Sequence, residues 1–163
     1  MIHDWQQLPH VRQWWSDESQ EELYEEYILR TGSDMVKPFV ALWEAEPLQD
    51  EPLGYIQYYH AARVGDGWWP DETEGTIGMD QYIGPEKFLS RGHGTGMIAA
   101  FVDQVLSKLD YTCLMVDPDP ENERAIRCYA RLGFKEQGLT KTPDGAALLM
   151  KRFRESQGTI RKR

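Results

Sequence analysis

Long apolar runs are absent from this sequence of 163 residues, and their absence excludes one class of protein. No stretch is long enough and apolar enough to span a bilayer. The first ten residues, MIHDWQQLPH, lack the basic start and apolar centre of a signal peptide. We therefore expect a cytoplasmic protein that has no membrane partner.

Cysteine and net positive charge are also scarce. Cys113 and Cys128 are too few for a disulfide framework and lack metal-ligand spacing, so we expect two reduced thiols in or near the core, no metal site and no Cys nucleophile. The net charge of −9 argues against nucleic-acid binding, which normally needs a basic surface. The acidic excess serves either solubility alone or a cleft that attracts cations.

Apolar residues make up 40% of the chain and aromatic residues 12%, which is enough for one full core and too little for two domains. We expect one domain over residues 1–155 and a flexible basic tail over residues 156–163.

The order of predicted elements gives the fold class. Helices are expected at 10–15 and at 19–32, the second with Leu23, Tyr27 and Ile28 on one face, and another helix runs from the glycine-rich stretch to Leu109. The run 111–118 suits a central strand covered on both faces, and the helix at 119–134 has Asp119 as its N-cap. Further strands are expected at 37–47, 51–65, 75–84, 134–142 and 145–153. This order predicts an α/β domain whose sheet is mixed, mostly antiparallel and flanked by helices, rather than doubly wound.

The sequence RGHGTG, residues 91–96, lies between a predicted strand and a predicted helix. Free backbone N–H groups at a helix start suit a phosphate or pyrophosphate, and glycines let the backbone approach it. A simple tight turn is the alternative. The P-loop Lys-Ser/Thr pair is absent, and the glycine spacing differs from the dinucleotide fingerprint.

These residues carry a family resemblance. RGHGTG resembles the Gln/Arg-x-x-Gly-x-Gly/Ala signature of the GCN5-related N-acetyltransferases, which bind the pyrophosphate of acetyl-coenzyme A there, and NERAIRCYARLGF at 122–134 resembles their Asn…Ala…Tyr…Gly-Phe helix. GYIQYY, GDGWW, MDQ, VDPDPENERAIRCY and TPDG are similar in order and spacing to the aminoglycoside 6′-N-acetyltransferase branch, over nearly the whole chain from PHVRQWW. The family usually opens with a β-strand, whereas this chain begins within the first helix, so either that strand is missing or the natural start lies further upstream.

The resemblance implies acetyl-coenzyme A as cosubstrate and a set of residues that bind it. No Ser or Cys nucleophile with a His partner is visible, which favours direct attack by the acceptor amine within a ternary complex. The expected cofactor-binding residues are Tyr82, Arg91, Gly92, His93, Gly94, Thr95, Gly96 and Asn122.

Two residues are expected to be catalytic. Asp80 lies within an otherwise apolar strand, and we assign it as general base, although such a carboxylate could instead cap a turn. The resemblance implies that Tyr129 stands near the sulfur of coenzyme A as general acid; the alternative is an ordinary core tyrosine.

An aminoglycoside is a polycation, so its pocket needs carboxylates and aromatic faces. Asp66 shares a loop with Trp68, and this combination suits a cationic aminosugar. The alternative is a solvated acidic loop without a ligand. Asp117 ends the central strand, where it binds an amine or makes an Asx-turn before Pro118. The resemblance adds further substrate-binding candidates, namely Trp15, Tyr27, Asp34 and Gln57.

Three functions follow as hypotheses. The leading one is acetyl-coenzyme A-dependent N-acetylation of the 6′-amine of aminoglycoside antibiotics, a resistance activity. The second is an acyltransferase of a lysine-derived siderophore precursor or another small amine, because openings of the PHV…WW type also resemble that branch. The third is a non-catalytic binding module. The sequence leaves monomer and homodimer equally open.

Overall fold

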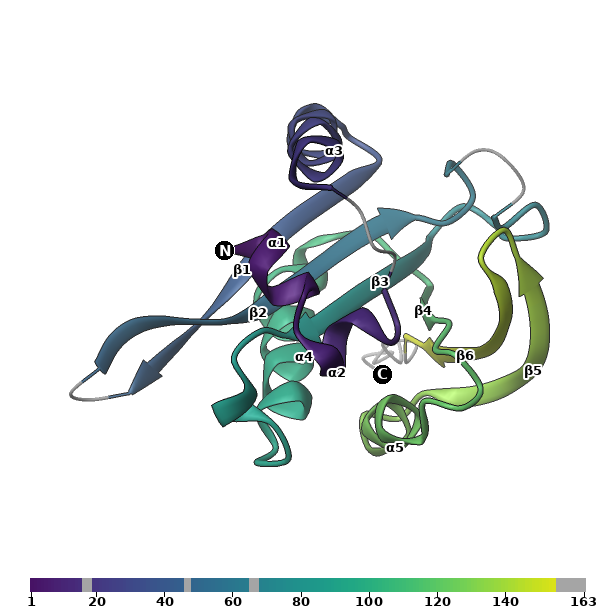
Figure 1. Ribbon diagram of the computed structural model, residues 1–163. Helices are drawn as coiled ribbons and strands as arrows, with labels where there is room; N and C mark the ends of the chain where they lie inside the picture. The colour runs from purple at the N-terminus through teal and green to yellow at the C-terminus, as the bar shows by residue number, and fades with distance from the viewer. Residues whose placement is uncertain (16–18, 46–47, 65–67, 155–163) are drawn as a thin grey trace, which may run out of the picture.

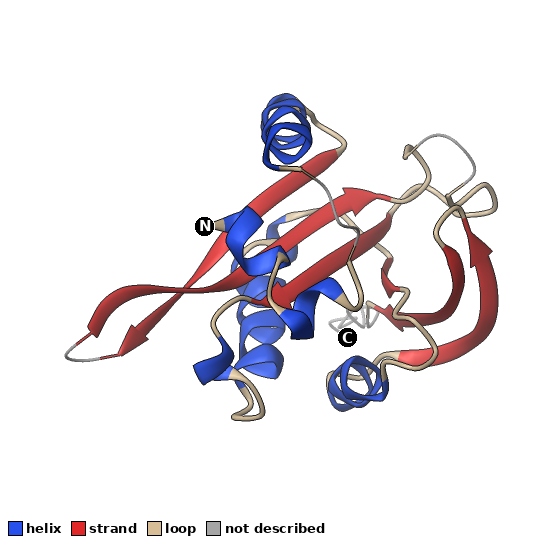
Figure 2. Cartoon of the chain, viewed as in Figure 1, coloured by secondary structure: helices blue, strands red, loops and turns tan. Residues whose placement is uncertain are grey.

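The computed structural model describes residues 1–15, 19–45, 48–64 and 68–154. In these residues a six-stranded sheet has helices on both faces (Figures 1 and 2). The helices are α1 (Ile2–Gln6), α2 (Pro9–Arg12), α3 (Gln20–Gly32), α4 (His93–Gln104) and α5 (Glu123–Arg131). The strands are β1 (Val36–Ala45), β2 (Leu48–His60), β3 (Thr76–Ile83), β4 (Cys113–Val116), β5 (Lys135–Thr142) and β6 (Gly145–Phe153).

The sheet has the strand order β1-β2-β3-β4-β6-β5. Only the β3–β4 pair is parallel among the described strands, and the other pairs are antiparallel. The predicted mixed, mostly antiparallel sheet is therefore confirmed. Ahead of β1, residues 1–15 and 19–32 contain the helices α1, α2 and α3 and no strand.

The parallel pair β3–β4 is short, and this opens the sheet. Thr76–Gly78 align with Cys113–Met115, but β3 then continues to Ile83 with a partner on its β2 side only. The two strands part beyond that point, as Figure 1 shows. Ligand sites in sheets of this kind lie beyond the carboxyl ends of parallel strands, so the opening is the first place to look for one.

Two apolar clusters hold the helices against the sheet. On the α4 side, Ile98, Phe101 and Leu106 are buried as the helical spacing predicts, and they pack with Ile56 of β2. On the opposite face, Trp5 of α1 packs with residues of α2, β2 and β3, including Val11, Tyr55 and Tyr82. A Cβ at Gly84 would lie 2.3 Å from the Trp5 ring, so α1 docks closely only over a glycine.

The N-terminal helices differ from the prediction. Helix α1 was not predicted, because five residues are too few to show a periodic pattern, and burial of Trp5 holds it in place. The helix expected at 10–15 is α2, which starts one residue earlier because Pro9 occupies its first turn. In α3, Leu23 is buried and Tyr27 half-buried as expected, but Ile28 is 52% exposed.

Three further boundaries differ. Helix α5 is capped by Asn122, whose Oδ1 accepts from the Ala125 amide at 3.1 Å, and not by Asp119. The Asp119 carboxylate instead accepts from the Glu121 amide at 2.7 Å, in a turn before the helix, because Asp-Pro is also a turn signal. The helix expected to reach Leu109 ends at Gln104 and is followed by a short 3₁₀ turn, and β2 ends at His60 rather than at residue 65.

Both cysteines are free, with Cys113 buried and Cys128 half-buried, as predicted. No described helix has the length and apolarity that a membrane crossing needs. The predicted tail at 156–163 lies outside the described residues.

Candidate active site

The glycine-rich stretch forms the start of α4. Gly92 is the N-cap residue and has φ of 84°, a left-handed conformation that suits glycine. No side chain caps this helix. The Gly96 amide bonds to the Gly92 carbonyl at 3.0 Å, which leaves the amides ahead of it in the first turn for another acceptor. An uncapped helix start of this kind suits an anion.

Two side chains of the stretch anchor it to neighbouring elements. The His93 ring stands edge-on to Trp43 and Phe88, with centroids 4.4 and 5.2 Å away. The Thr95 hydroxyl lies 3.3 Å from the Cys128 thiol, which links α4 to α5. The backbone of these residues, more than their side chains, is thus what a phosphate could contact. Of the remaining members of the stretch, Arg91, Gly92 and Gly96 are exposed and Gly94 is half-buried.

A cavity of about 360 Å³ lies at the opening between β3 and β4. It is bounded by residues of β3, α4 and α5 and of the segment around α2. Its lining brings together five of the predicted site residues, namely Trp15, Tyr82, Gly94, Asn122 and Tyr129. Such a volume is within the range of small-ligand sites.

Two residues that line this cavity carry buried polar atoms without hydrogen-bond partners in the described part of the chain. The Tyr82 hydroxyl and Gln81 Oε1 are buried, belong to lining residues, and have no hydrogen-bond partner among the described residues. Buried polar groups in native proteins are nearly always paired, so these two atoms are suited to bonds with a ligand or with water.

Tyr129 is 8% exposed, and its hydroxyl oxygen accepts a hydrogen bond from Gln81 Nε2. Burial raises the pKa of Tyr129, and the charges of Asp80 and Asp117 raise it further. The phenol therefore stays protonated at neutral pH, and because its oxygen is the acceptor for Gln81, its own proton remains available for donation.

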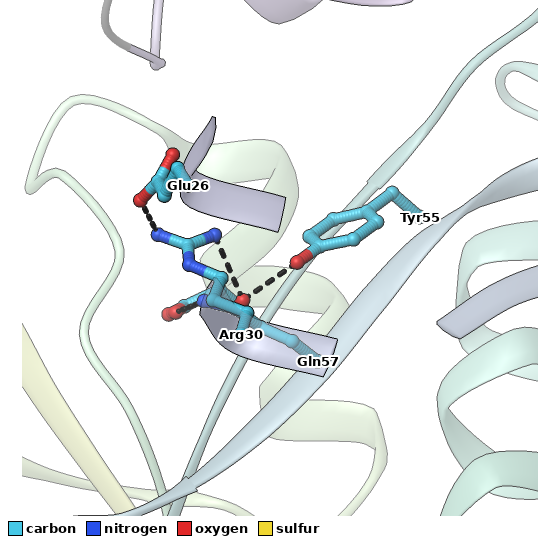
Figure 3. Close-up of polar contacts among 5 residues, drawn as sticks. Glu26, Arg30, Tyr55 and Gln57 are labelled. Carbon is cyan, nitrogen blue, oxygen red and sulfur yellow. Dashed lines mark hydrogen bonds and ion pairs between the residues drawn. The ribbon is translucent and has the colours of Figure 1, made fainter. Parts of the chain in front are cut away.

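Asp80 belongs to a hydrogen-bonded chain that starts on α3. Gln57 of β2 lies opposite Asp80 in the strand register and donates from Nε2 to Asp80 Oδ2 at 2.7 Å. Gln57 Oε1 accepts from the Tyr55 hydroxyl at 2.6 Å and from Arg30 Nη1 at 3.0 Å. Figure 3 shows this oxygen between its two donors, with Arg30 also paired to Glu26 on the same helix.

Three carboxyl groups influence one another at this end of the sheet. Burial raises the pKa of Asp80, the Gln57 hydrogen bond and the Arg30 charge oppose that rise, and Asp144 adds to it. Burial, together with the charges of Asp80 and Asp144, raises the pKa of Asp117 to about 8. Carboxyl groups that repel one another in this way favour a cationic ligand.

Aromatic rings line the same face of the sheet. The Trp15 ring lies edge-on to Tyr82 and Tyr55, with centroids 4.8 and 6.0 Å away. Tyr27 packs edge-on to Tyr55 at 5.4 Å, and its hydroxyl has no described hydrogen-bond partner. Trp68 is half-buried and its ring centroid lies 6.3 Å from that of Trp69, which belongs to the core.

One predicted substrate-binding residue, Asp34, is not brought into this group. The Asp34 side chain is fully exposed and pairs with Lys37 at 3.4 Å, without a described contact to the other carboxylates. Asp66 lies outside the described residues.

Sequence reasoning did not include three residues of the site. Arg30 follows Leu23 by seven positions and Tyr27 by three, so the inner face of α3 could have revealed it. Asp144 lies in the TPDG turn, and the sequence does not show the shape of the pocket around it. Gln81 has no local signal, because its partner Tyr129 comes from another element.

Comparison with known proteins agrees with this geometry. The family model described as an acetyltransferase (GNAT) domain matches residues 1–142, and the chain belongs to this family. It is 36% identical over 162 residues to the aminoglycoside N(6′)-acetyltransferase type 1 of Klebsiella pneumoniae, covering 96% of this chain and 78% of that protein.

Solved structures give the same result. The chain is similar to aminoglycoside acetyltransferase AAC(6′)-Ib in complex with coenzyme A and kanamycin, with a TM-score of 0.83, 36% identity, and 94% of this chain and 88% of that chain covered. It is also similar to AAC(6′)-Ib in complex with ribostamycin and coenzyme A, with a TM-score of 0.85, 34% identity, and 99% and 91% covered.

Proposed function

We propose that this protein transfers the acetyl group of acetyl-coenzyme A to the 6′-amine of aminoglycoside antibiotics, and that it acts in the cytoplasm. The observation that carries the proposal is the position of Tyr129, which lines the cavity at the β3–β4 opening and lies within electrostatic reach of Asp80 and Asp117. Tyr129 thus stands between the cavity and the carboxylates. The cavity suits an anionic cosubstrate, and the carboxylates suit a polycationic acceptor.

The cavity side suits acetyl-coenzyme A, which supplies the acetyl group as an activated thioester. The first-turn amides of α4 would hold its pyrophosphate, with Arg91 adding positive charge at the edge. Asn122 and Tyr82 line the same cavity as Tyr129, and both carry polar side-chain atoms. These polar atoms are suited to the amide groups of the pantetheine arm.

The carboxylate side suits the amine. Asp80 accepts a proton from the 6′-ammonium group, so that the neutral amine can attack the thioester carbonyl directly. Its raised pKa makes Asp80 a stronger base than an ordinary aspartate. As the carbon–sulfur bond breaks, Tyr129 donates its proton to the departing sulfur, which leaves as a neutral thiol. The second proton that the attacking nitrogen loses in forming the amide restores the Tyr129 phenol.

The other acidic and aromatic residues hold the acceptor. Asp117 and Asp144 attract further ammonium groups, and binding of a cation returns Asp117 to its ionised form. Trp15 and Tyr27 offer aromatic faces on which sugar rings can pack. In this assignment Asp80 serves the chemistry, and the remaining groups serve recognition.

Release of free thiol from acetyl-coenzyme A tests the proposal. Aminoglycosides with a 6′-amine should release thiol and gain one acetyl group at that nitrogen, as measured by mass spectrometry and NMR. The matched control is an aminoglycoside whose 6′ position carries a hydroxyl, which should release none. Thiol release with hydroxylysine-like amines alone would indicate the second hypothesis, and no release with any amine would indicate a binding module.

A further inference from the structure

Arg30 is a charged side chain held in place on three sides. It pairs with Glu26 one turn earlier on α3, donates from Nη1 to Gln57 Oε1 at 3.0 Å, and lies 5.5 Å from the centroid of the Tyr27 ring. A guanidinium group has donors only, so whatever atom it meets at Gln57 must be an acceptor.

This restriction fixes the orientation of the Gln57 amide. Gln57 is 5% exposed, and its Oε1 already accepts from Arg30 and from Tyr55. A reversed amide would set its NH₂ group against the guanidinium and its oxygen against the Asp80 carboxylate, so both contacts would become repulsive. Gln57 Nε2 is therefore directed at Asp80 Oδ2, to which it donates at 2.7 Å.

We propose that Arg30 is a positioning residue for the base Asp80, acting through the amide of Gln57. The inference rests on the proposed function in that Asp80 accepts the proton of the acceptor amine. Arg30 fixes the amide, the amide holds Oδ2, and Oδ1, which has no described hydrogen-bond partner, is left for the ammonium group. Arg30 touches neither substrate nor cosubstrate in this arrangement.

The charges around Asp80 give the direction of the effect. The groups that interact with Asp80 are Arg30 of α3, Gln57 and Tyr59 of β2, Asp117 after β4, Tyr129 of α5 and Asp144 of the β5–β6 turn. Glu26 is paired with Arg30. Burial and Asp144 raise the pKa of Asp80, whereas Arg30 and the Gln57 hydrogen bond lower it. Removing Arg30 should therefore raise that pKa further and leave less of the basic form at a given pH.

Replacement of Arg30 by Met, measured as kcat/KM of the full chain against pH, tests the proposal. The low-pH part of the plot of kcat/KM against pH, the acid limb, should move to higher pH. At a fixed pH on this limb kcat/KM should fall by about 5–10-fold, and the loss should become smaller as the pH rises. Arg30→Lys keeps the positive charge but lacks the planar guanidinium donors, so its acid limb should lie between those of Arg30→Met and the parent. The control is Arg127→Met, which removes an exposed pair with Glu123 at the same helical spacing and should leave the limb in place.

A readout without substrate separates this proposal from the proposed function. Titration of the Asp80 carboxyl by ¹³C NMR in the ligand-free protein should show a higher midpoint in Arg30→Met than in the parent. If the parent acetylates no aminoglycoside, the proposed function fails and this titration still decides the role of Arg30. An acid limb and a carboxyl titration that both match the parent would overturn the proposal.

A second variant covers the case in which Arg30→Met does not fold. Gln57→Leu keeps the Arg30–Glu26 pair on α3 and removes only the link to Asp80. It should raise the Asp80 titration midpoint, because the carboxylate loses a hydrogen bond that favours its charged form. An unchanged midpoint in this variant would refute the connection through the amide.

Discussion

Replacing Asp80 by Asn separates proton transfer from every other task of this side chain. The amide has the same shape, and its oxygen can accept from Gln57 Nε2 as Asp80 Oδ2 does now at 2.7 Å. It cannot take a proton at neutral pH. General-base catalysis contributes about 10²–10⁴-fold, so turnover at saturating substrate should fall by that factor, which is about 3–5 kcal/mol in the barrier.

The same change should affect stability only slightly, because two effects oppose each other. The folded-state pKa of Asp80 is raised above its ordinary value of 3.8, so the ionised group opposes folding at pH above that value and does not below it. Asn removes this penalty at neutral pH. A neutral acceptor also weakens the Gln57 bond by about 1 kcal/mol, so the melting temperature should stay within about 4 °C of the parent.

Two assays complete the test. Steady-state thiol release over a range of aminoglycoside concentrations gives kcat and KM separately, and carboxyl NMR reports Asp117, whose raised pKa of about 8 owes part of its rise to Asp80. In Asp80→Asn that pKa should fall. Near-normal turnover with a raised KM would refute the assignment, since Asp80 would then be a cation contact only and the proton would leave through water or Asp117.

Three other variants probe the rest of the site. Tyr129→Phe should lower kcat more than it raises either Michaelis constant, because its proton is needed only as the thiolate departs; unchanged kcat would return Tyr129 to a core role. Gly94→Leu should weaken acetyl-coenzyme A binding in calorimetry by about tenfold or more, and the fold should survive because a Cβ there lies 3.9 Å from the nearest side-chain atom, of Ile83; unaltered affinity would remove the α4 start from the site. Asp117, with its pKa of about 8, releases a proton when a cation binds, so Asp117→Asn should release fewer protons on aminoglycoside binding than the parent does. Calorimetry in two buffers of different ionisation enthalpy measures the number of protons released. An identical number in the variant would exclude Asp117 from the cation site.

Local patterns predicted the helices and strands that carry their own signal. The apolar spacing of Ile98, Phe101 and Val102 predicted the buried face of α4, and the continuous apolar run predicted the buried strand β4. Where two signals compete, as at Asp119, the boundary moved by three residues. Short elements such as α1 have too few residues for a period, and packing of Trp5 decides them instead.

The candidate site was predictable as a set of residues but not as an arrangement. The family resemblance supplied Asp80, Tyr129 and the α4 start, yet the contacts among them depend on strand register. Asp80 meets Gln57 because β2 and β3 pair in one particular register, and a shift of one residue would turn Asp80 to the other face of the sheet. The spacing on α3 places Arg30 on the inner face of that helix, but its contact with Gln57 depends on how α3 packs against β2, which no local pattern encodes.

Strand β3 explains how one site serves two ligands of opposite charge. Successive side chains of a strand point to opposite faces, so Asp80 faces Gln57 and the α3 side while its neighbour Gln81 bonds to Tyr129 of α5. In a strand paired on both sides these two faces would be separated by the sheet. Because β4 leaves β3 after Gly78, the two faces meet at the opening. In the proposed mechanism, one of two consecutive residues is the base and the other bonds to the acid.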